Sequence, residues 1–149
     1  MVKTQKKFAI VVSRFNEFIT HRLLQGCLKE FKAGGVKETD ISISWVPGAL
    51  EIPVTALKWA QKKNIAAVIG LGCVIRGETY HFELVANEAA RGLMDVSLKT
   101  GKSVIFGVLS TDTVEQANQR SRLDRGDNKG RDAAQAALEM VNVLNKIKS

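Results

Sequence analysis

The sequence contains few of the residues that form disulfide bonds or bind structural metal ions. Its 149 residues include only two cysteines, Cys27 and Cys73, whose spacing fits no zinc or iron–sulfur pattern. Two cysteines make no disulfide framework, so we expect both to be buried small hydrophobic residues in a reducing compartment. A chain of this length buries about 68–70% of its unfolded surface when it folds, so its stability does not require a disulfide bond or a bound metal ion.

Long hydrophobic runs, targeting segments and low-complexity tracts are also missing. The first apolar run, residues 8–12, ends at Ser13 and is too short for a signal peptide or a membrane span. We therefore expect a cytoplasmic protein without a membrane partner. The composition, 45% hydrophobic and 25% charged, is typical of a globular protein and predicts one domain over residues 1–149.

Aromatic residues make up only 6% of a chain whose formal net charge is +7. Such a charge suits nucleic acid or a small anionic substrate. The positive residues are scattered along the sequence, and three aspartates, Asp124, Asp127 and Asp132, dilute the densest cluster, residues 120–132. This pattern lacks the basic stripe with interleaved aromatics that nucleic-acid binders show, so we expect no nucleic-acid partner.

Short apolar runs alternate with segments of helical spacing. Strands are predicted at 8–12, 41–46, 66–75 and 103–109, and helices at 19–33, 53–63, 80–100, from 112 onward and 130–146. This alternation predicts an α/β three-layer sandwich, in which a four-stranded parallel sheet has helices on both faces. The polar face of 41–46 indicates an edge strand. Asp112 is expected to cap the fourth helix with Glu115, and Met94 to face inward.

Ligands of such sheets lie beyond the carboxyl ends of the strands. The third of these ends, C-V-I-R-G-E-T-Y-H-F at 73–82, is the richest. Gly77 permits a tight turn, and the backbone N–H groups of Gly77, Glu78 and Thr79 would be free at a helix start, where phosphate binds. The alternative is a plain capped turn with Thr79 as the N-cap. No nucleotide-binding glycine motif is complete.

Four other side chains at or near strand ends have one functional and one ordinary interpretation. His81 can accept a proton from a reacting amine or carbon, or can be structural. Phe15 can stack on a planar ligand or merely cover the core. Glu51 can accept hydrogen bonds from ligand hydroxyls or cap a helix. Arg120 can bind phosphate or be a surface charge.

Five motifs lie in order along nearly the whole chain. They are S-R-F-N at 13–16, W-V-P-G-A-L-E-I-P at 45–53, G-C-V-I-R-G-E-T-Y-H-F-E at 72–83, F-G-V-L-S-T-D-T-V-E-Q-A at 106–117 and N-K-G at 128–130. Together they resemble the lumazine synthase family. The resemblance implies a flavodoxin-like sheet with strand order 2-1-3-4.

The resemblance also implies a role for each site residue. Phe15 stacks on a pyrimidine ring, and Ala49 and Glu51 bind a ribityl chain. The backbone around Val74 and Ile75, in a segment that includes Cys73, reads the uracil edge. The phosphate is held by Gly77, Glu78 and Thr79, and His81 transfers protons. A neighbouring subunit supplies Phe106 beside the ring, Arg120 on the phosphate and Lys129 in support.

The implied reaction condenses 5-amino-6-(D-ribitylamino)uracil with 3,4-dihydroxy-2-butanone 4-phosphate to give 6,7-dimethyl-8-ribityllumazine, the penultimate step of riboflavin biosynthesis. It implies no cofactor and no metal. A non-catalytic flavin-binding or scaffold relative is the main alternative, although Phe15, Glu51, His81 and Arg120 are all present. A flavodoxin-like carrier would need a phosphate-binding Ser/Thr/Gly loop after the first strand, and S-R-F-N-E-F offers none.

One departure from the family pattern bears on assembly. Many members have a compact A-G-T-K-x-G stretch before N-K-G, whereas this chain reads S-R-L-D-R-G-D at 121–127, one residue longer. Members that close into sixty-subunit shells tend to keep the short form. The resemblance implies a homo-oligomer with its active site at the subunit interface, and the longer stretch predicts a pentamer rather than a 60-mer shell.

Overall fold

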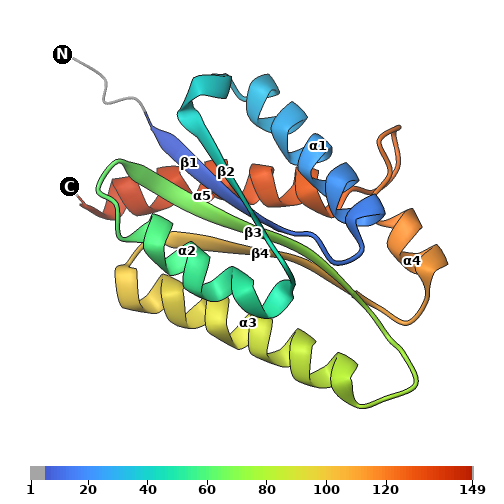
Figure 1. Ribbon diagram of the computed structural model, residues 1–149. Helices are drawn as coiled ribbons and strands as arrows, with labels where there is room; N and C mark the ends of the chain where they lie inside the picture. Colours follow the sequence, from blue (N-terminus) through green and yellow to red (C-terminus); the bar gives the residue numbers. More distant parts are fainter. Residues whose placement is uncertain (1–5, 149) are drawn as a thin grey trace.

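A parallel four-stranded sheet runs through the computed structural model, which describes residues 6–148 (Figure 1). Its strands are β1 (Lys7–Ser13), β2 (Ile41–Val46), β3 (Ile65–Ile75) and β4 (Ser103–Thr111). They pair in the order β2-β1-β3-β4, all parallel, which confirms the expected 2-1-3-4 order and the position of β2 at an edge. The other edge strand is β4, and this edge becomes part of the candidate site.

Helices cover both faces of the sheet, as the alternating pattern predicts (Figure 1). Helices α1 (Glu17–Ala33) and α5 (Lys129–Lys148) pack on one face, together with the short α4 (Val114–Gln119). The other face carries α2 (Ile52–Ala60) and α3 (His81–Thr100), and two 3₁₀ turns, Glu38–Asp40 and Ala49–Glu51, flank β2. The three-layer α/β sandwich is therefore confirmed.

The apolar run of β1 supplies both cores because its side chains alternate between the two faces. Phe8, Ile10 and Val12 lie in the core under α1 and α5, where the Phe8 ring is 4.7 Å from that of Phe31. Ala9 and Val11 lie in the core under α2 and α3. A strand buried on both faces must be apolar throughout, which explains the uninterrupted run.

Glycine and proline mark several helix ends where the sequence indicates them. Gly101 ends α3 in the left-handed conformation at φ 71°, which favours glycine. Pro53 occupies the first turn of α2, where its missing N–H costs no helical hydrogen bond. Helix α2 ends at Ala60, three residues earlier than the sequence suggests.

Two details of the helix predictions are wrong. The cap of α4 is Thr113, whose hydroxyl accepts from the backbone of Gln116, while the Gln116 side chain accepts from the Thr113 backbone. Asp112, the predicted cap, instead pairs with Arg76. On α3, Met94 is 59% exposed, because the buried stripe passes through Leu93 and Val96.

Lysines that are far apart in the sequence gather at the amino-terminal edge of the sheet. Lys7 begins β1, Lys37 shortly precedes β2, residues 62–63 precede β3 and Lys102 precedes β4. The last turns of helices add further lysines at this edge: Lys32, Lys58, Lys99 and Lys146. Part of the positive charge is therefore concentrated at this edge, and the absence of a nucleic-acid partner stays a prediction.

No helix in the part of the chain that the structure describes is long and apolar enough to cross a membrane. Within the same residues, no group of three or more histidine, cysteine, aspartate or glutamate side chains is arranged to hold a metal ion.

Candidate functional site

The carboxyl ends of β1, β2 and β3 are joined by hydrogen bonds at one edge of the sheet. The Phe15 backbone N–H donates to the Pro47 carbonyl at 3.1 Å, and the Asn16 side-chain amide donates to the Cys73 carbonyl at 2.9 Å. Asn16 adopts the left-handed conformation, φ 62° and ψ 47°, which is uncommon outside glycine. These contacts place Phe15 beside the segments that carry the other predicted substrate-binding residues.

Some of the predicted substrate-binding residues have exposed side chains, and others have buried ones. The side chains of Phe15, at 69%, and Glu51 are exposed and free to contact a ligand. The side chains of Ala49, Cys73 and Val74 are buried, so these residues can meet a ligand only through their backbone. The Cys73 carbonyl is already used by Asn16. We call this part of the site, with the turn and histidine described next, the strand-end half: Phe15, Ala49, Glu51, Cys73, Val74, Ile75, Gly77, Glu78, Thr79 and His81.

The turn from Gly77 to Thr79 is exposed, and it leads into α3. Among residues 6–148, the structure gives the three backbone N–H groups of this turn no hydrogen-bond acceptor. Tyr80 occupies the N-cap position without a side-chain cap, while the Thr79 hydroxyl accepts from the His81 backbone at 3.4 Å. The turn is thus only loosely capped, and its amides are available as donors at a helix start.

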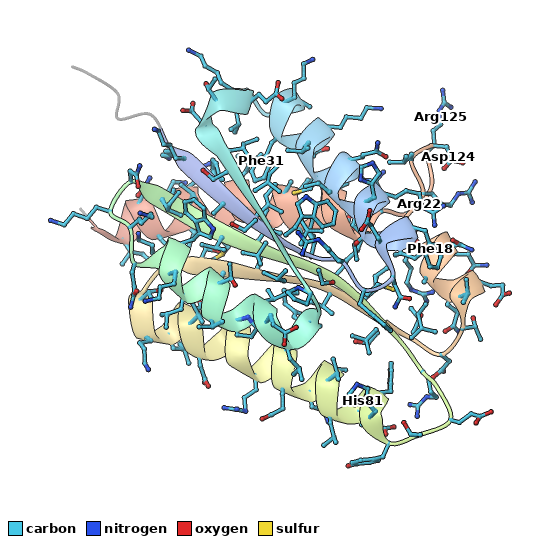
Figure 2. The ribbon with its side chains drawn as sticks, in the orientation of Figure 1. Phe18, Arg22, Phe31, His81, Asp124 and Arg125 are labelled. Atoms are coloured by element: carbon cyan, nitrogen blue, oxygen red, sulfur yellow. The ribbon has the colours of Figure 1, made fainter. Side chains whose placement is uncertain are left out.

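His81 is the first residue of α3 and is exposed at that helix end (Figure 2). Its imidazole makes no hydrogen bond within the described part of the chain. A ring without a structural partner beside a turn with free amides fits proton transfer better than a packing role.

A groove of about 580 Å³ follows the exposed edge of β4, between α3 and α4. Phe106 lines it from the strand, with 37% of its side chain exposed, and Arg120 lines it from the end of α4. The remaining lining comes from Arg76 after β3, from α3, from the end of β4 and from α4, and it includes Phe82, Glu83, Ser110, Thr111, Asp112 and Gln116. Phe106 and Arg120, predicted to act together, thus share one groove.

A second hollow of about 380 Å³ joins Arg120 to Lys129. The Lys129 backbone N–H donates to the Arg120 carbonyl at 2.9 Å, so the two residues are adjacent. Asp127 and Asp132 line the same hollow. We call Phe106, Arg120 and Lys129 the edge half of the site.

Buried polar residues fix the backbone of the edge half. Ser121 is fully buried and pairs with Asn128, which is 2% exposed. Asn128 donates to the Arg22 carbonyl at 3.2 Å and accepts from the Arg131 backbone at 3.0 Å, capping the start of α5. Sequence reasoning missed this role, although an asparagine just before a helical pattern is a usual N-cap signal.

Gly130 lets α5 approach α1 closely. A Cβ atom there would lie 1.8 Å from the Leu23 carbonyl oxygen, so no larger residue fits. The N-K-G motif therefore has a structural asparagine and glycine on either side of the predicted functional lysine.

The loop before N-K-G is closed by a backbone hydrogen bond. The Arg122 backbone N–H donates to the Asp127 carbonyl at 2.9 Å, which closes the loop at its base. Asp124 and Arg125 lie at its outer end (Figure 2). The Arg122 guanidinium and the Gly126 backbone hold the pKa of Asp124 below its usual range. Residues 122–127 are thus held together by contacts within the loop itself.

The two arginines of the groove differ in charge balance. Arg76 pairs with Glu83 and Asp112, each at 2.7 Å, and these carboxylates raise the pKa of its guanidinium. Arg120 donates only to the Gln116 backbone carbonyl, at 3.2 Å, and forms no ion pair within residues 6–148. Of the two arginines that line the groove, Arg120 is therefore the one whose charge no carboxylate balances within residues 6–148.

Both cysteine thiols are buried, as predicted, and burial raises the pKa of Cys27 and of Cys73 to about 12. Neither is a thiolate near neutral pH, so neither is a candidate nucleophile.

The strand-end half lies outside both hollows that the edge half lines. Neither the groove nor the second hollow is lined by a strand-end residue. The fold and these two halves define a class: a three-layer α/β protein whose candidate site lies at the carboxyl ends of a parallel sheet, where such folds bind ligands.

Comparison with known families specifies this class further. The model of the 6,7-dimethyl-8-ribityllumazine synthase family matches residues 5–145, nearly the whole chain, and the chain belongs to this family. Membership implies a lumazine synthase activity within riboflavin biosynthesis.

Proposed function

We propose that this protein condenses 5-amino-6-(D-ribitylamino)uracil with 3,4-dihydroxy-2-butanone 4-phosphate to form 6,7-dimethyl-8-ribityllumazine. One observation carries the proposal: the exposed 77–79 turn offers three amides without acceptors, and Arg120 offers a guanidinium without a carboxylate. Together these are the donors that a phosphate monoester needs. Family membership supports the identity of the substrates.

The reaction joins the two substrates in three steps. The primary amine of the uracil attacks the ketone, and an imine forms with loss of water. Phosphate then leaves by elimination, as a proton is removed from the adjacent carbon. The ribitylamino nitrogen closes the second ring, and a second water is lost. The protein contributes mainly by holding the two substrates in reacting geometry.

The strand-end half binds and orients the substrates. The exposed Phe15 ring stacks on the pyrimidine, and Glu51 accepts hydrogen bonds from ribityl hydroxyls beside the Ala49 backbone. The backbone at Val74 and Ile75 pairs with the uracil edge. His81, at the start of α3, takes up and returns the protons of the imine and elimination steps.

A neighbouring subunit completes each site with its edge half. Its Phe106 borders the ring, its Arg120 holds the phosphate across from the 77–79 turn, and its Lys129 supports the pocket. A cyclic assembly supplies such heterologous contacts to every chain equally. A pentamer in the cytoplasm is part of the proposal, and a light-scattering mass near sixty chains would overturn the pentamer.

The direct test mixes the purified protein with both substrates and follows lumazine formation by fluorescence. We expect a rate well above that of the uncatalysed reaction. A rate equal to the uncatalysed one, with riboflavin or lumazine still bound, would instead identify a non-catalytic flavin-binding or scaffold relative.

A further inference from the structure

Arg76 connects segments that belong to both halves of the site. It is the residue immediately before Gly77, and its backbone N–H donates to the Thr111 carbonyl at 2.8 Å. Its Nε donates to Asp112 and its Nη1 to Glu83, each at 2.7 Å. The guanidinium also lies 4.6 Å from the centre of the Phe82 ring. One side chain thereby holds the start of α3 and the end of β4 together.

The Asp112 contact continues toward Arg120. The Asp112 backbone N–H donates to the Gln116 side-chain oxygen at 2.8 Å, and Gln116 belongs to the capping box of α4. Arg120 follows the last residue of α4 and donates its guanidinium to the Gln116 carbonyl. A series of hydrogen bonds thus runs from Arg76, the residue before the 77–79 turn, to Arg120.

Arg76 is a poor candidate for an anion ligand, although it lines the same groove as Arg120. Its two carboxylate partners more than balance its charge. Because the guanidinium is 46% exposed, such pairs contribute little to folding stability. The effect of the network is therefore to fix the relative positions of the segments it joins.

We propose that Arg76 is a positioning residue that sets the 77–79 turn and the α4 end carrying Arg120 in the geometry that binds a phosphate monoester. This inference rests on the function proposed above. In a ring of subunits, the turn of one chain serves one site while its Arg120 serves the next. Arg76 then aligns two neighbouring sites without contacting the substrate in either.

The chain offers a matched control on the same helix. Arg91 of α3 also holds two carboxylates, Glu88 at 3.0 Å and Asp95 at 2.9 Å, with 63% of its side chain exposed. It lines neither the groove nor the second hollow. Arg76→Gln and Arg91→Gln therefore remove equivalent surface networks, and only the first touches the site.

The experiment compares both variants with the parent protein by steady-state kinetics and thermal unfolding. For Arg76→Gln we expect the KM of the butanone phosphate to rise about tenfold, the KM of the uracil substrate to stay unchanged and kcat to fall less than about threefold. Arg76→Lys should recover part of the loss, since an ammonium can hold one carboxylate at a time. Arg91→Gln should match the parent, and the unfolding temperatures of the two glutamine variants should agree.

Two further measurements keep the outcome decisive. If Arg76→Gln fails to fold, Asp112→Asn and Glu83→Gln remove one arm each and should raise the same KM. Inorganic phosphate, titrated against thermal unfolding, should protect the parent and Arg91→Gln more than Arg76→Gln. An inactive parent overturns the proposed function alone. An equal KM and equal phosphate protection in Arg76→Gln and Arg91→Gln overturn the role of Arg76.

Discussion

The strand-end half and the edge half of the site are held in different ways. In the strand-end half the 77–79 turn has amides without acceptors, and a Cβ at Gly77 would meet nothing within 4 Å. In the edge half, Arg120 is followed by a buried serine and lies beside a buried asparagine, Asn128, and α4 begins with a complete capping box. The strand-end half thus presents backbone N–H donors, and the edge half presents the Arg120 guanidinium on a backbone that is held in place.

The difference shows what each half can supply. Backbone amides at an open turn can adjust to an anion but carry no full charge. A guanidinium carries the charge, but is useful only where its backbone is held in place. A phosphate site that needs both features needs both halves, and neither of the two hollows at the edge half includes a strand-end residue.

The largest effect should come from the edge half. Arg120→Ala removes a bidentate, charge-assisted contact with phosphate and should lower kcat/KM for the butanone phosphate about 10³-fold. Arg125→Ala, in the neighbouring loop and lining neither hollow, removes the same charge and should leave kcat/KM unchanged. An equal fall in kcat/KM in the two variants would show that the net charge of the protein, and not the position of Arg120, determines the affinity for the phosphate.

Replacing His81 should cost less than replacing Arg120. Once the substrates are aligned the chemistry is easy, so His81→Ala should lower kcat about 10²-fold, and by less than about 10³-fold. Steady-state kinetics with both substrates saturating measures this directly. If kcat/KM for the butanone phosphate fell further in His81→Ala than in Arg120→Ala, proton transfer rather than phosphate binding would make the larger contribution to catalysis.

Gly77→Ala separates binding from folding in the strand-end half. The added methyl group has open space in the isolated chain, so the unfolding temperature should stay within about 2 °C of the parent. In the assembled site the methyl group approaches the anion, and the KM of the butanone phosphate should rise about tenfold. An unchanged KM would place the phosphate elsewhere.

The smallest effect concerns Cys73, which lies beneath the strand-end half with its thiol in the core. Alkylation by iodoacetamide at pH 8 should label neither cysteine in the folded protein and leave activity unchanged. Burial raises the pKa of both thiols from 9.0 to about 12, so the stability they contribute is full below pH 9 and is lost as pH rises toward 12. Loss of activity after native labelling at Cys73 would contradict its buried placement.

The layers and strand positions could be predicted because both faces of the sheet are covered. Val11 and Val12 of β1 point to opposite cores, so this strand must be apolar along its whole length. The helices between the strands bury only one face, so their apolar residues recur at helical spacing. The candidate residues of β3 and the 77–79 turn follow from the same logic, because ligands bind at the carboxyl ends of parallel strands.

The details that failed depend on contacts between distant segments. Aspartate is a common N-cap residue, but the Asp112 carboxylate accepts a hydrogen bond from Arg76, 36 residues earlier. The N-cap of α4 is Thr113 instead. Asn128 looked like part of a motif, yet its amide reaches Arg22 across 106 residues. The lysines converge for a related reason: strand starts and helix ends meet at one edge of a parallel sheet, which spacing along the chain does not reveal.

The most direct test of the central claim, that each phosphate site combines halves from two chains, is complementation between variants. The double variant Glu51→Ala/His81→Ala disables the strand-end half, and Arg120→Ala disables the edge half. Co-expressed with different tags and purified through both, mixed rings should contain native pairs of halves at about a quarter of their sites. We predict activity far above that of either variant alone, whereas activity no higher than the mean of the two would contradict the shared site.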